Sequence, residues 1–261
     1  MAEQLSKMKE QVYKDPRPSS YFDRFHAQAR RQPPNLMYEW VRMVLSPIVW
    51  LVYRARCIGA PQVPDSGPVI IAPNHFSFLD HFFVAAFVRR KVHFMAKSNL
   101  FGWYTQHVFR NGGVFPVRRG ARDEEAFVTA RTVLDRGNTM VMYCEGGRSR
   151  TGGLSDSAKP GIGRIALQTG AAIVPVAIYG SQKVRNWKRL QAPKVTVLYG
   201  EAMRFPVVAE PTREQQQAVA DAVFAEIRAL YGELETVGRA GARRRERAGR
   251  RAEPAEPAAT A

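Results

Sequence analysis

The chain has 261 residues, which is long enough for one sizeable α/β domain with appendages. Apolar residues make up 45% of it and aromatic residues 10%, which excludes wholesale disorder. The formal net charge of +16 favours a polyanionic partner, either nucleic acid or an anionic membrane surface. Nothing in the sequence resembles a nucleic-acid-binding motif, and the basic residues share the chain with an apolar segment. We therefore expect an anionic membrane surface as partner and no specific nucleic acid.

The two cysteines, Cys57 and Cys144, lie far apart in the sequence. The polar residues 1–35 contain no uninterrupted apolar run of the kind that secretion signals carry. A reduced cytosolic environment without disulfides is expected. Within 1–35 we predict a short helix near 2–14 and a flexible or loosely packed linker through 14–18.

Residues 36–56 contain an apolar segment, 36–52, that is shorter than the roughly 20 residues needed to span a bilayer. Glu39, Arg42 and Ser46 give this segment one polar stripe at helical spacing. We predict an amphipathic helix in the membrane interface, with peripheral or monotopic attachment to the cytoplasmic face of the cell membrane. A core helix packed on the domain is the main alternative, and a true span is the least favoured.

Residues 57–235 alternate predicted strands with predicted helices. Strands are expected near 69–72, 92–95, 114–117, 139–143, 172–178 and 194–198, and helices near 77–89, 99–110, 123–136, 159–168 and 212–234. This order predicts an α/β domain with a mostly parallel or mixed central sheet flanked by helices. In such sheets the site lies beyond the carboxyl ends of the strands.

The heptapeptide 74–80 follows the strand expected at 69–72. On a straight helix, five residues would separate the His75 and Asp80 side chains by about 140°. The two can meet only if His75 lies in a loop and Asp80 in the first helical turn. The capping-box pattern from Ser77 to Asp80 predicts that geometry, with Ser77 at the N-cap and Asp80 at N3. The pair then suits a general base held by a carboxylate; a helix-capping Asp80 beside a buried, satisfied histidine is the alternative.

A metal site is not expected. His81 adds a second imidazole directly after Asp80, but no third ligand lies at a recognisable spacing.

Four sequence blocks together resemble the glycerolipid acyltransferases, the family of 1-acylglycerol-3-phosphate O-acyltransferases. In the family's order, they are Asn74-His75 with Asp80, Gly112 to Arg118, Glu145 to Ser149, and Ile173 to Ile178. The chain departs from the family's third block in two places. It has Gly147 where threonine is usual, and Tyr143-Cys144 where Phe-Pro is usual.

The resemblance implies transfer of a fatty acyl group from a thioester to the free hydroxyl of lysophosphatidate, which gives phosphatidate. His75 would be the general base and Asp80 its orienting partner. The thioester donor would be acyl-CoA or acyl carrier protein, and no further cofactor is expected. The same chemistry on glycerol 3-phosphate or another lysophospholipid is the alternative. A non-catalytic membrane-binding protein is less favoured because the His/Asp pair is intact.

The acceptor's phosphate requires cations, which the second and third blocks supply. Arginine offers a fork that matches phosphate oxygens, and Lys97 adds a point charge. By block position the predicted substrate-binding residues are Lys97, Phe115, Arg118, Glu145, Gly146, Gly147, Arg148 and Ser149. The two glycines would let backbone N–H groups approach an oxyanion or phosphate, and Glu145 would order the loop. The alternative for each arginine is a surface residue or an ion pair, with Glu145 as a partner for Arg148.

Cys144 provides a rival mechanism, with a thiol nucleophile and His75 as its base. Burial at a strand end would keep that thiol protonated and inert. Ser149 as a nucleophile is similarly disfavoured.

Residues 236–261 lack apolar periodicity and are predicted to form a disordered basic tail. Near an anionic surface each arginine could add about 1 kcal/mol of attraction. A solvated tail without a specific role is the alternative. The arginines concerned are Arg239, Arg243, Arg244, Arg245, Arg247, Arg250 and Arg251.

Overall fold

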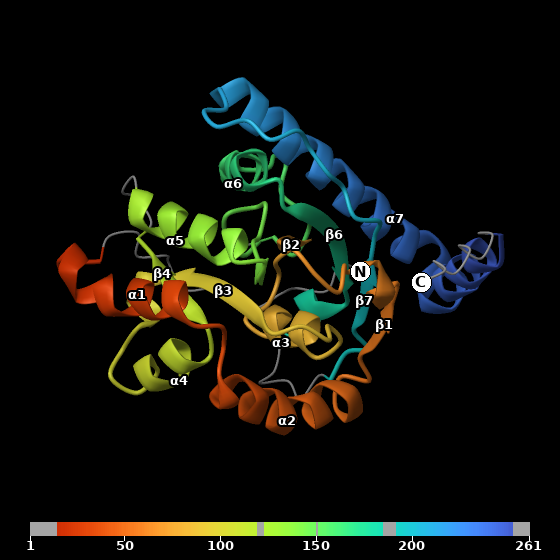
Figure 1. Cartoon of the computed structure of the whole chain (residues 1–261). Helices are drawn as coiled ribbons and strands as arrows, with labels where there is room; N and C mark the ends of the chain where they lie inside the picture. Colours follow the sequence, from red (N-terminus) through yellow and green to blue (C-terminus); the bar gives the residue numbers. More distant parts are fainter. Residues whose placement is uncertain (1–14, 119–122, 150, 185–191, 253–261) are drawn as a thin grey trace, which may run out of the picture.

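The computed structural model describes residues 15–118, 123–149, 151–184 and 192–252. Its centre is a seven-stranded sheet in the order β1-β7-β6-β2-β5-β3-β4 (Figure 1). The strands are β1 (Arg56–Ile58), β2 (Val69–Pro73), β3 (Val92–Lys97), β4 (Val114–Val117), β5 (Thr139–Val141), β6 (Ala172–Tyr179) and β7 (Thr196–Tyr199). The five strands from β2 to β6 are parallel, whereas β7 is antiparallel to β6 and β1 is parallel to β7. The predicted α/β fold with a mixed sheet is therefore confirmed.

Helices cover both faces of the sheet. The α-helices are α1 (Asp23–Arg31), α2 (Leu36–Leu51), α3 (Asp80–Ala85), α4 (Gln106–Asn111), α5 (Glu124–Asp135), α6 (Gly161–Thr169) and α7 (Arg213–Ala252). Short 3-10 helices are η1 (Ser19–Phe22), η2 (Ala60–Gln62) and η3 (Ser98–Leu100). Helices α5, α6 and α7 lie on one face, and α3 and α2 lie on the other (Figure 1).

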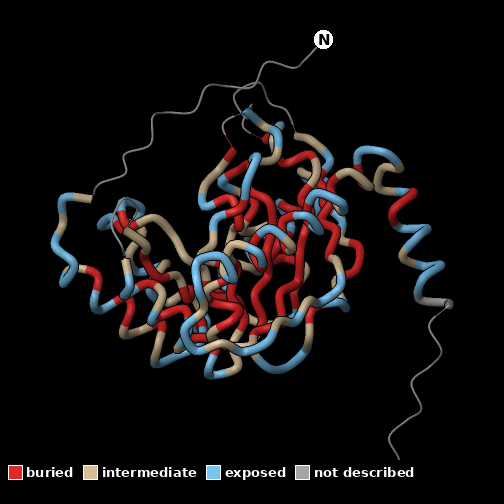
Figure 2. The backbone as a smooth tube through the Cα atoms, turned by 90° about the horizontal axis from the view of Figure 1, so that it is seen from above, coloured by how far each residue is buried: buried red, intermediate tan, exposed pale blue. Residues whose placement is uncertain are grey.

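Alternation along β2 explains the two faces. Ile70 and Ala72 join the core cluster that includes residues of α5, α6 and α7. Val69 and Ile71 point the other way, into the cluster with Phe83 of α3. Because both faces are covered, every residue of β2 is buried. Figure 2 shows a buried centre within a more exposed periphery.

The segment before α2 belongs to the domain, which corrects the expected linker. Arg17 is paired with Asp15 at 2.6 Å and donates to the carbonyl oxygens of Phe101 (2.6 Å) and Ser98 (2.7 Å). Phe22 and Phe25 form a buried cluster with Phe101. The polar composition of this segment gave no signal that these few aromatic side chains pack on the domain. The helix expected near 2–14 lies outside the described residues.

The C-terminal stretch also differs from the prediction. Instead of becoming disordered at residue 236, α7 continues to Ala252, with one non-helical residue at Gly238 (φ 62°). Ala242 is buried in a cluster with Ile58 and Leu198, so this part of the helix packs on the sheet. Alanine and arginine are strong helix formers, and that propensity outweighed the missing apolar periodicity. The predicted tail residues beyond Ala252 lie outside the described part.

Candidate active site

The loop after β2 is pinned to the neighbouring strand β6 by Asn74. The Asn74 side chain accepts a hydrogen bond from the Ile178 amide (2.6 Å) and donates one to the Ile178 carbonyl (3.1 Å). Asn74 is fully buried, so both bonds form away from water and are correspondingly firm. The next residue, His75, therefore starts from a fixed backbone position at the carboxyl edge of the sheet.

Asp80 is the hub of this loop. Its Oδ2 lies 2.9 Å from His75 Nδ1 and accepts hydrogen bonds from the backbone amides of Phe76 and Ser77, both at 2.7 Å. Asp80 is fully buried and His75 is nearly so. Three donors on one buried carboxylate oxygen hold the imidazole in one orientation, with Nε2 as the remaining nitrogen. The predicted contact between His75 and Asp80 is present.

The helix that carries Asp80 is shorter than predicted and is capped differently, because its N-cap is Leu79 without a side-chain capping bond and Asp80 is its first residue rather than N3. Asp80 accepts from the Ser77 amide, and Ser77 Oγ accepts from the Leu79 amide at 3.1 Å. Regular α-helix begins at Asp80 and ends at Ala85, rather than covering 77–89. Residues 78 and 79 form a turn that lets the carboxylate fold back toward His75.

Residues of the third block form hydrogen bonds with both the backbone amide and the backbone carbonyl of His75. Glu145 Oε1 accepts from the His75 amide (2.7 Å), and the Ser149 amide donates to the His75 carbonyl (2.8 Å). Glu145 Oε2 accepts from the amide (3.1 Å) and hydroxyl (2.6 Å) of Ser155. Burial raises the pKa of Glu145, and these hydrogen bonds oppose the shift. Glu145 thus orders the loop, and its carboxylate is not the partner of Arg148.

The glycines of the third block lie in the turn after β5. Gly146 has a left-handed backbone (φ 65°), which a side chain would strain. A Cβ there would also lie 3.0 Å from Lys159 Cγ. The Gly146 amide donates to the Tyr143 carbonyl at 3.1 Å, so that N–H is already used. Gly147 is half-buried in the same turn.

The predicted cations follow three neighbouring strands at the same edge of the sheet. Lys97 ends β3, Arg118 follows β4, and Arg148 lies in the loop after β5. Since β4 is three strands from β2, the Arg118 backbone is roughly 14 Å from that of His75. The Arg118 amide donates to Asp123 Oδ2 at 2.6 Å, and its buried Nε has no hydrogen-bond partner among the described residues. Arg148 is half-buried and lies close enough to His81 to lower the pKa of that imidazole.

Phe115 does not lie at the site. It is 0% exposed within the core cluster of β4, β2 and the helices above them, and its ring packs near that of His26 with centroids 6.3 Å apart. A direct substrate contact by Phe115, as the second block suggested, is incompatible with this burial. The aromatic position of that block instead packs the strand that carries Arg118.

Two residues beside His75 were not predicted as site residues. The Tyr143 ring stacks on the His75 ring with centroids 4.0 Å apart and an interplanar angle of 23°. The Tyr143 hydroxyl lies 2.7 Å from Nδ1 of His81. Two signals existed in the sequence, since Tyr143 departs from the family's usual phenylalanine and His81 adjoins Asp80.

Cys144 is fully enclosed by the core cluster, which argues against the thiol mechanism. Burial, and then the nearby Glu145, raise the pKa of the Cys144 thiol to about 12. A thiol with that pKa is almost entirely protonated near neutral pH, so it is a poor nucleophile.

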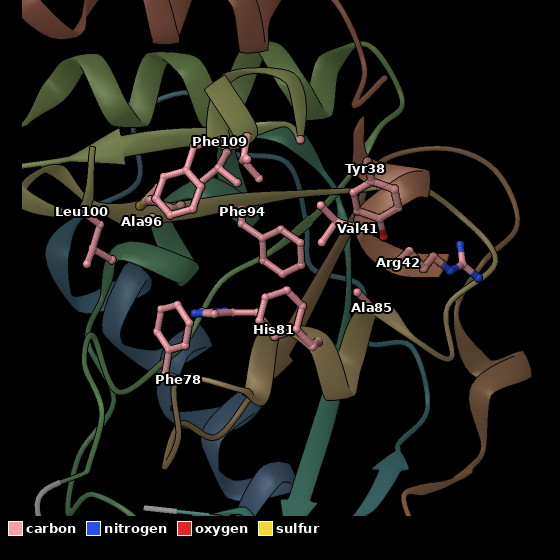
Figure 3. Close-up of a pocket in the computed structure, with 15 residues that line it drawn as sticks. Tyr38, Val41, Arg42, Phe78, His81, Ala85, Phe94, Ala96, Leu100 and Phe109 are labelled. Atoms are coloured by element: carbon pink, nitrogen blue, oxygen red, sulfur yellow. The ribbon is translucent and has the colours of Figure 1, made fainter. Parts of the chain in front are cut away.

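An apolar pocket opens on the side of the site that faces α2 and α4. Figure 3 shows its walls, which come from α2, α3, β3, α4 and β4. The aromatic side chains among them are Tyr38, Phe78, His81, Phe82, Phe94 and Phe109. His81 therefore belongs both to this pocket and to the surroundings of His75.

Comparison with known proteins finds similarity to acyltransferases. A family model described as Acyltransferase matches residues 54–179. The chloroplastic 1-acyl-sn-glycerol-3-phosphate acyltransferase of Arabidopsis thaliana is 28% identical over 153 residues, which cover 56% of this chain and 40% of that protein. The glycerol-3-phosphate acyltransferase of Shewanella woodyi is 31% identical over 144 residues, which cover 49% of this chain and 18% of that protein. This chain thus spans less than half the length of either relative.

The fold also has a solved counterpart. The crystal structure of the 1-acyl-sn-glycerophosphate acyltransferase from Thermotoga maritima aligns with a TM-score of 0.61 and 20% sequence identity. The alignment covers 83% of this chain and 89% of that one. At this identity the likeness establishes the shared fold.

Proposed function

We propose, since this chain belongs to the glycerolipid acyltransferase family, that it transfers a fatty acyl group from a thioester to the free hydroxyl of lysophosphatidate, giving phosphatidate. The observation that carries the proposal is the buried His75–Asp80 pair, with 2.9 Å between Nδ1 and Oδ2, beside an apolar pocket. The carboxylate holds the imidazole so that Nε2 can accept a proton.

In the proposed reaction, His75 Nε2 takes the proton of the acceptor hydroxyl while the hydroxyl oxygen attacks the thioester carbonyl. Asp80 stabilises the imidazolium that forms. The tetrahedral oxyanion collapses, the C–S bond breaks, and the thiolate takes the proton back from His75. No covalent acyl-enzyme is needed, and the protonated Cys144 agrees with that route.

The acyl chain is proposed to occupy the apolar pocket between α2, α3 and α4. Apart from Arg42, the pocket is lined mainly by aromatic and aliphatic side chains. It lies next to the general base, which is where the carbonyl end of the chain has to be. The acceptor's phosphate is proposed to bind Arg118 and Arg148, with Lys97 as a further positive charge. The buried Nε of Arg118, which has no partner in the described part of the chain, supports a ligand there.

Attachment to a membrane surface is proposed through the outer face of α2. That face carries exposed apolar side chains along its length, namely Leu36, Trp40, Met43, Val44, Ile48, Trp50 and Leu51. The polar stripe instead points inward, because Ser46 is buried and Arg42 lines the pocket. No helix within the described ranges is both long and apolar enough to cross a bilayer. The exposed apolar face opposite an inward polar stripe supports an interfacial helix. We propose that this helix lies at the cytoplasmic face of the membrane.

A basic groove lies at the end of α7, close to the segment that follows α2. Five cationic side chains line it, namely Lys194, Arg239, Arg243, Arg244 and Arg247. Arg239 anchors the groove to the segment after α2, because it donates to the Arg54 carbonyl at 3.0 Å. Anionic headgroups would therefore meet positive charge next to the apolar face.

Glycerol 3-phosphate is the second candidate acceptor. Glycerol-3-phosphate acyltransferases are among the relatives that match, and the proposed cations would suit either phosphate. The two acceptors differ in apolar content, since lysophosphatidate carries its own acyl chain and requires additional apolar surface.

The test is thiol release from a long-chain acyl-CoA, with lysophosphatidate, glycerol 3-phosphate or no acceptor, in the presence of anionic vesicles. We expect release that depends on lysophosphatidate and yields phosphatidate. Release with glycerol 3-phosphate alone would reassign the acceptor. The same series with acyl carrier protein thioesters identifies the donor, and failure of every donor and acceptor pair would contradict the proposed activity.

A further inference from the structure

A pair of polar side chains, Tyr143 and His81, is built into the wall between the apolar pocket and His75. The His81 ring centroid lies 5.3 Å from those of both His75 and Tyr143. The Tyr143 hydroxyl lies 2.7 Å from His81 Nδ1. Neither side chain has a role in the reaction as described so far.

The hydrogen bond between them determines which nitrogen of His81 carries the proton. Burial raises the pKa of Tyr143 well above its usual value, so its hydroxyl keeps its proton. Among the described residues this hydroxyl has no other hydrogen-bond partner, and a buried O–H left without an acceptor is unfavourable. Tyr143 therefore donates to Nδ1, and the proton of the neutral His81 ring resides on Nε2.

His81 is held neutral by its surroundings. Burial, then the neighbouring His75, lower the pKa of His81 to about 3. A neutral imidazole with a fixed tautomer is a hydrogen-bond donor that keeps its proton during a reaction. Neutral histidines in other enzymes polarise carbonyl groups in this way.

The position of His81 gives this donor a target. The ring contacts Phe78 and Phe94 edge-on, with centroid distances of 6.1 and 5.6 Å, and both phenylalanines line the apolar pocket. Figure 3 shows His81 reaching from α3 toward Phe78 within the pocket wall. A thioester whose chain fills the pocket and whose carbonyl carbon is attacked at His75 has its carbonyl group between the two imidazoles.

We propose that His81 donates a hydrogen bond from Nε2 to the acyl carbonyl oxygen and to the oxyanion that forms on attack, and that Tyr143 is the positioning residue that fixes this tautomer. The inference rests on the proposed function. As the new C–O bond forms, the carbonyl electron pair moves to the oxygen that His81 binds, and the acceptor's proton goes to His75. When the C–S bond breaks, the electron pair returns and the thiolate takes that proton, while His81 remains neutral throughout.

The Gly146 and Ser149 amides of the third block are weaker sources of this hydrogen bond. The Gly146 amide donates to the Tyr143 carbonyl, and the Ser149 amide donates to the His75 carbonyl. Both N–H groups are therefore used within the loop. The side chain of His81 is the polar donor that the pocket wall offers beside His75.

The Tyr143 ring has a second effect on the same step. It stacks on His75 at 4.0 Å, so the imidazolium formed during attack lies over an aromatic face. A cation over a tyrosine ring is stabilised. Replacing Tyr143 by phenylalanine keeps this stack and removes only the hydroxyl, which separates the two effects.

The experiment compares three variants with the wild type in the acyl-CoA and lysophosphatidate assay. His81→Phe keeps a flat ring but removes the donor, and we expect kcat to fall about 10²-fold with a much smaller change in KM for the donor. His81→Gln restores an N–H donor and should recover part of that loss. Tyr143→Phe should lower kcat about tenfold, because His81 is no longer confined to one tautomer.

A direct readout of the tautomer does not depend on turnover. Long-range proton–nitrogen correlation spectra of protein labelled with ¹⁵N-histidine distinguish the two neutral tautomers of His81, which His81→Gln identifies by loss of its signals. We expect the proton on Nε2 in the wild type and a mixture of tautomers in Tyr143→Phe. A wild-type proton on Nδ1, or a folded His81→Phe variant with kcat within threefold of the wild type, would overturn the inference.

Failure of the proposed function would look different. In that case the wild type itself would release no thiol with any acceptor, which contradicts both proposals. An active wild type whose rate is indifferent to His81 contradicts this inference alone. Circular dichroism and thermal melting of each variant show whether a loss of rate comes from a loss of fold.

Discussion

The loop that carries His75 and the outer face of α2 are held in opposite ways. The loop is buried, and its backbone groups and the Asn74 side chain are hydrogen-bonded to β6 and the third block. The outer face of α2 presents apolar side chains to solvent, and nothing in the described chain covers them. The His75 loop keeps its geometry without a bound ligand or membrane. The outer face of α2, in contrast, exposes apolar surface to water when no partner covers it, which is unfavourable. Substitutions in the loop should therefore change the chemical step, and substitutions on α2 should change where the protein resides.

The largest effect is expected for His75→Ala. Removing the general base should lower kcat for acyl transfer by about 10³-fold, within the range typical of this kind of catalysis. The measurement is thiol release at saturating donor and acceptor. A variant that keeps more than a tenth of the wild-type rate would move the base elsewhere, and vesicle binding should be unchanged because α2 is untouched.

Asp80→Asn should have the next largest effect, on rate and stability together. The carboxylate oxygen serves two backbone amides and His75 at once. An amide cannot stabilise the imidazolium, and its NH₂ group favours the wrong tautomer of His75, so we expect kcat to fall about 10²-fold. Weakening the buried hydrogen bonds should lower the free energy of unfolding by about 1–3 kcal/mol.

Ser77→Ala is the matched control for Asp80→Asn. It removes the hydroxyl that accepts from Leu79 but leaves the carboxylate and the imidazole in place. Loss of this hydrogen bond in the turn before α3 costs about 0.5–1.5 kcal/mol of stability. If Ser77→Ala lowers kcat as much as Asp80→Asn does, the carboxylate acts through loop order rather than through His75.

The contact between His75 and Asp80 could be predicted from the sequence because the signals for it are local. The capping pattern from Ser77 to Asp80 and the strand before it define how a histidine and a carboxylate five residues apart can meet. The strand order is not local, and it places Arg118 three strands away from β2 and Phe115 inside the core. Block position alone therefore grouped residues that the sheet separates.

The orientation of α2 was less predictable from the sequence, because it also depends on packing between distant segments. The composition of residues 36–52 indicates an amphipathic helix, but not which side faces the protein. In the structure the polar stripe points inward, where Arg42 lines the pocket, and the apolar side points outward. The polar composition around η1 and α1 gave no signal for their packed aromatic side chains. The arginine-rich composition likewise gave no signal for the helical end of α7. Tertiary packing decided the first two, and the helix propensity of alanine and arginine decided the third.

A double substitution on α2 tests its outer face directly. Met43 and Ile48 are 67% and 44% exposed, and replacing both by glutamate removes apolar contact and adds negative charge. We expect binding to anionic vesicles to weaken about tenfold or more, with the rate on monomeric short-chain substrates nearly unchanged. Val207→Glu is the control, because Val207 is 69% exposed on a segment that follows β7. Equal loss of vesicle binding in the control would show a general charge effect rather than a surface centred on α2.

The smallest effect is expected for Cys144→Ser, which tests whether the buried thiol next to Glu145 takes part in the reaction. Although Cys144 adjoins Glu145, its thiol is enclosed by the core and has a pKa of about 12, so roughly one thiol in 10⁴ is ionised at pH 8. Alkylation by iodoacetamide at pH 8 should therefore modify the half-buried Cys57 first, and the reaction of Cys144 should wait for unfolding. The Cys144→Ser variant should keep kcat within about twofold, apart from a modest loss of stability from placing a hydroxyl in an apolar site. A 10²-fold loss of rate in a folded Cys144→Ser variant, together with fast alkylation that acyl-CoA blocks, would instead make the thiol the nucleophile. The hydrogen-bonded loop would then orient His75 toward Cys144 rather than toward the acceptor.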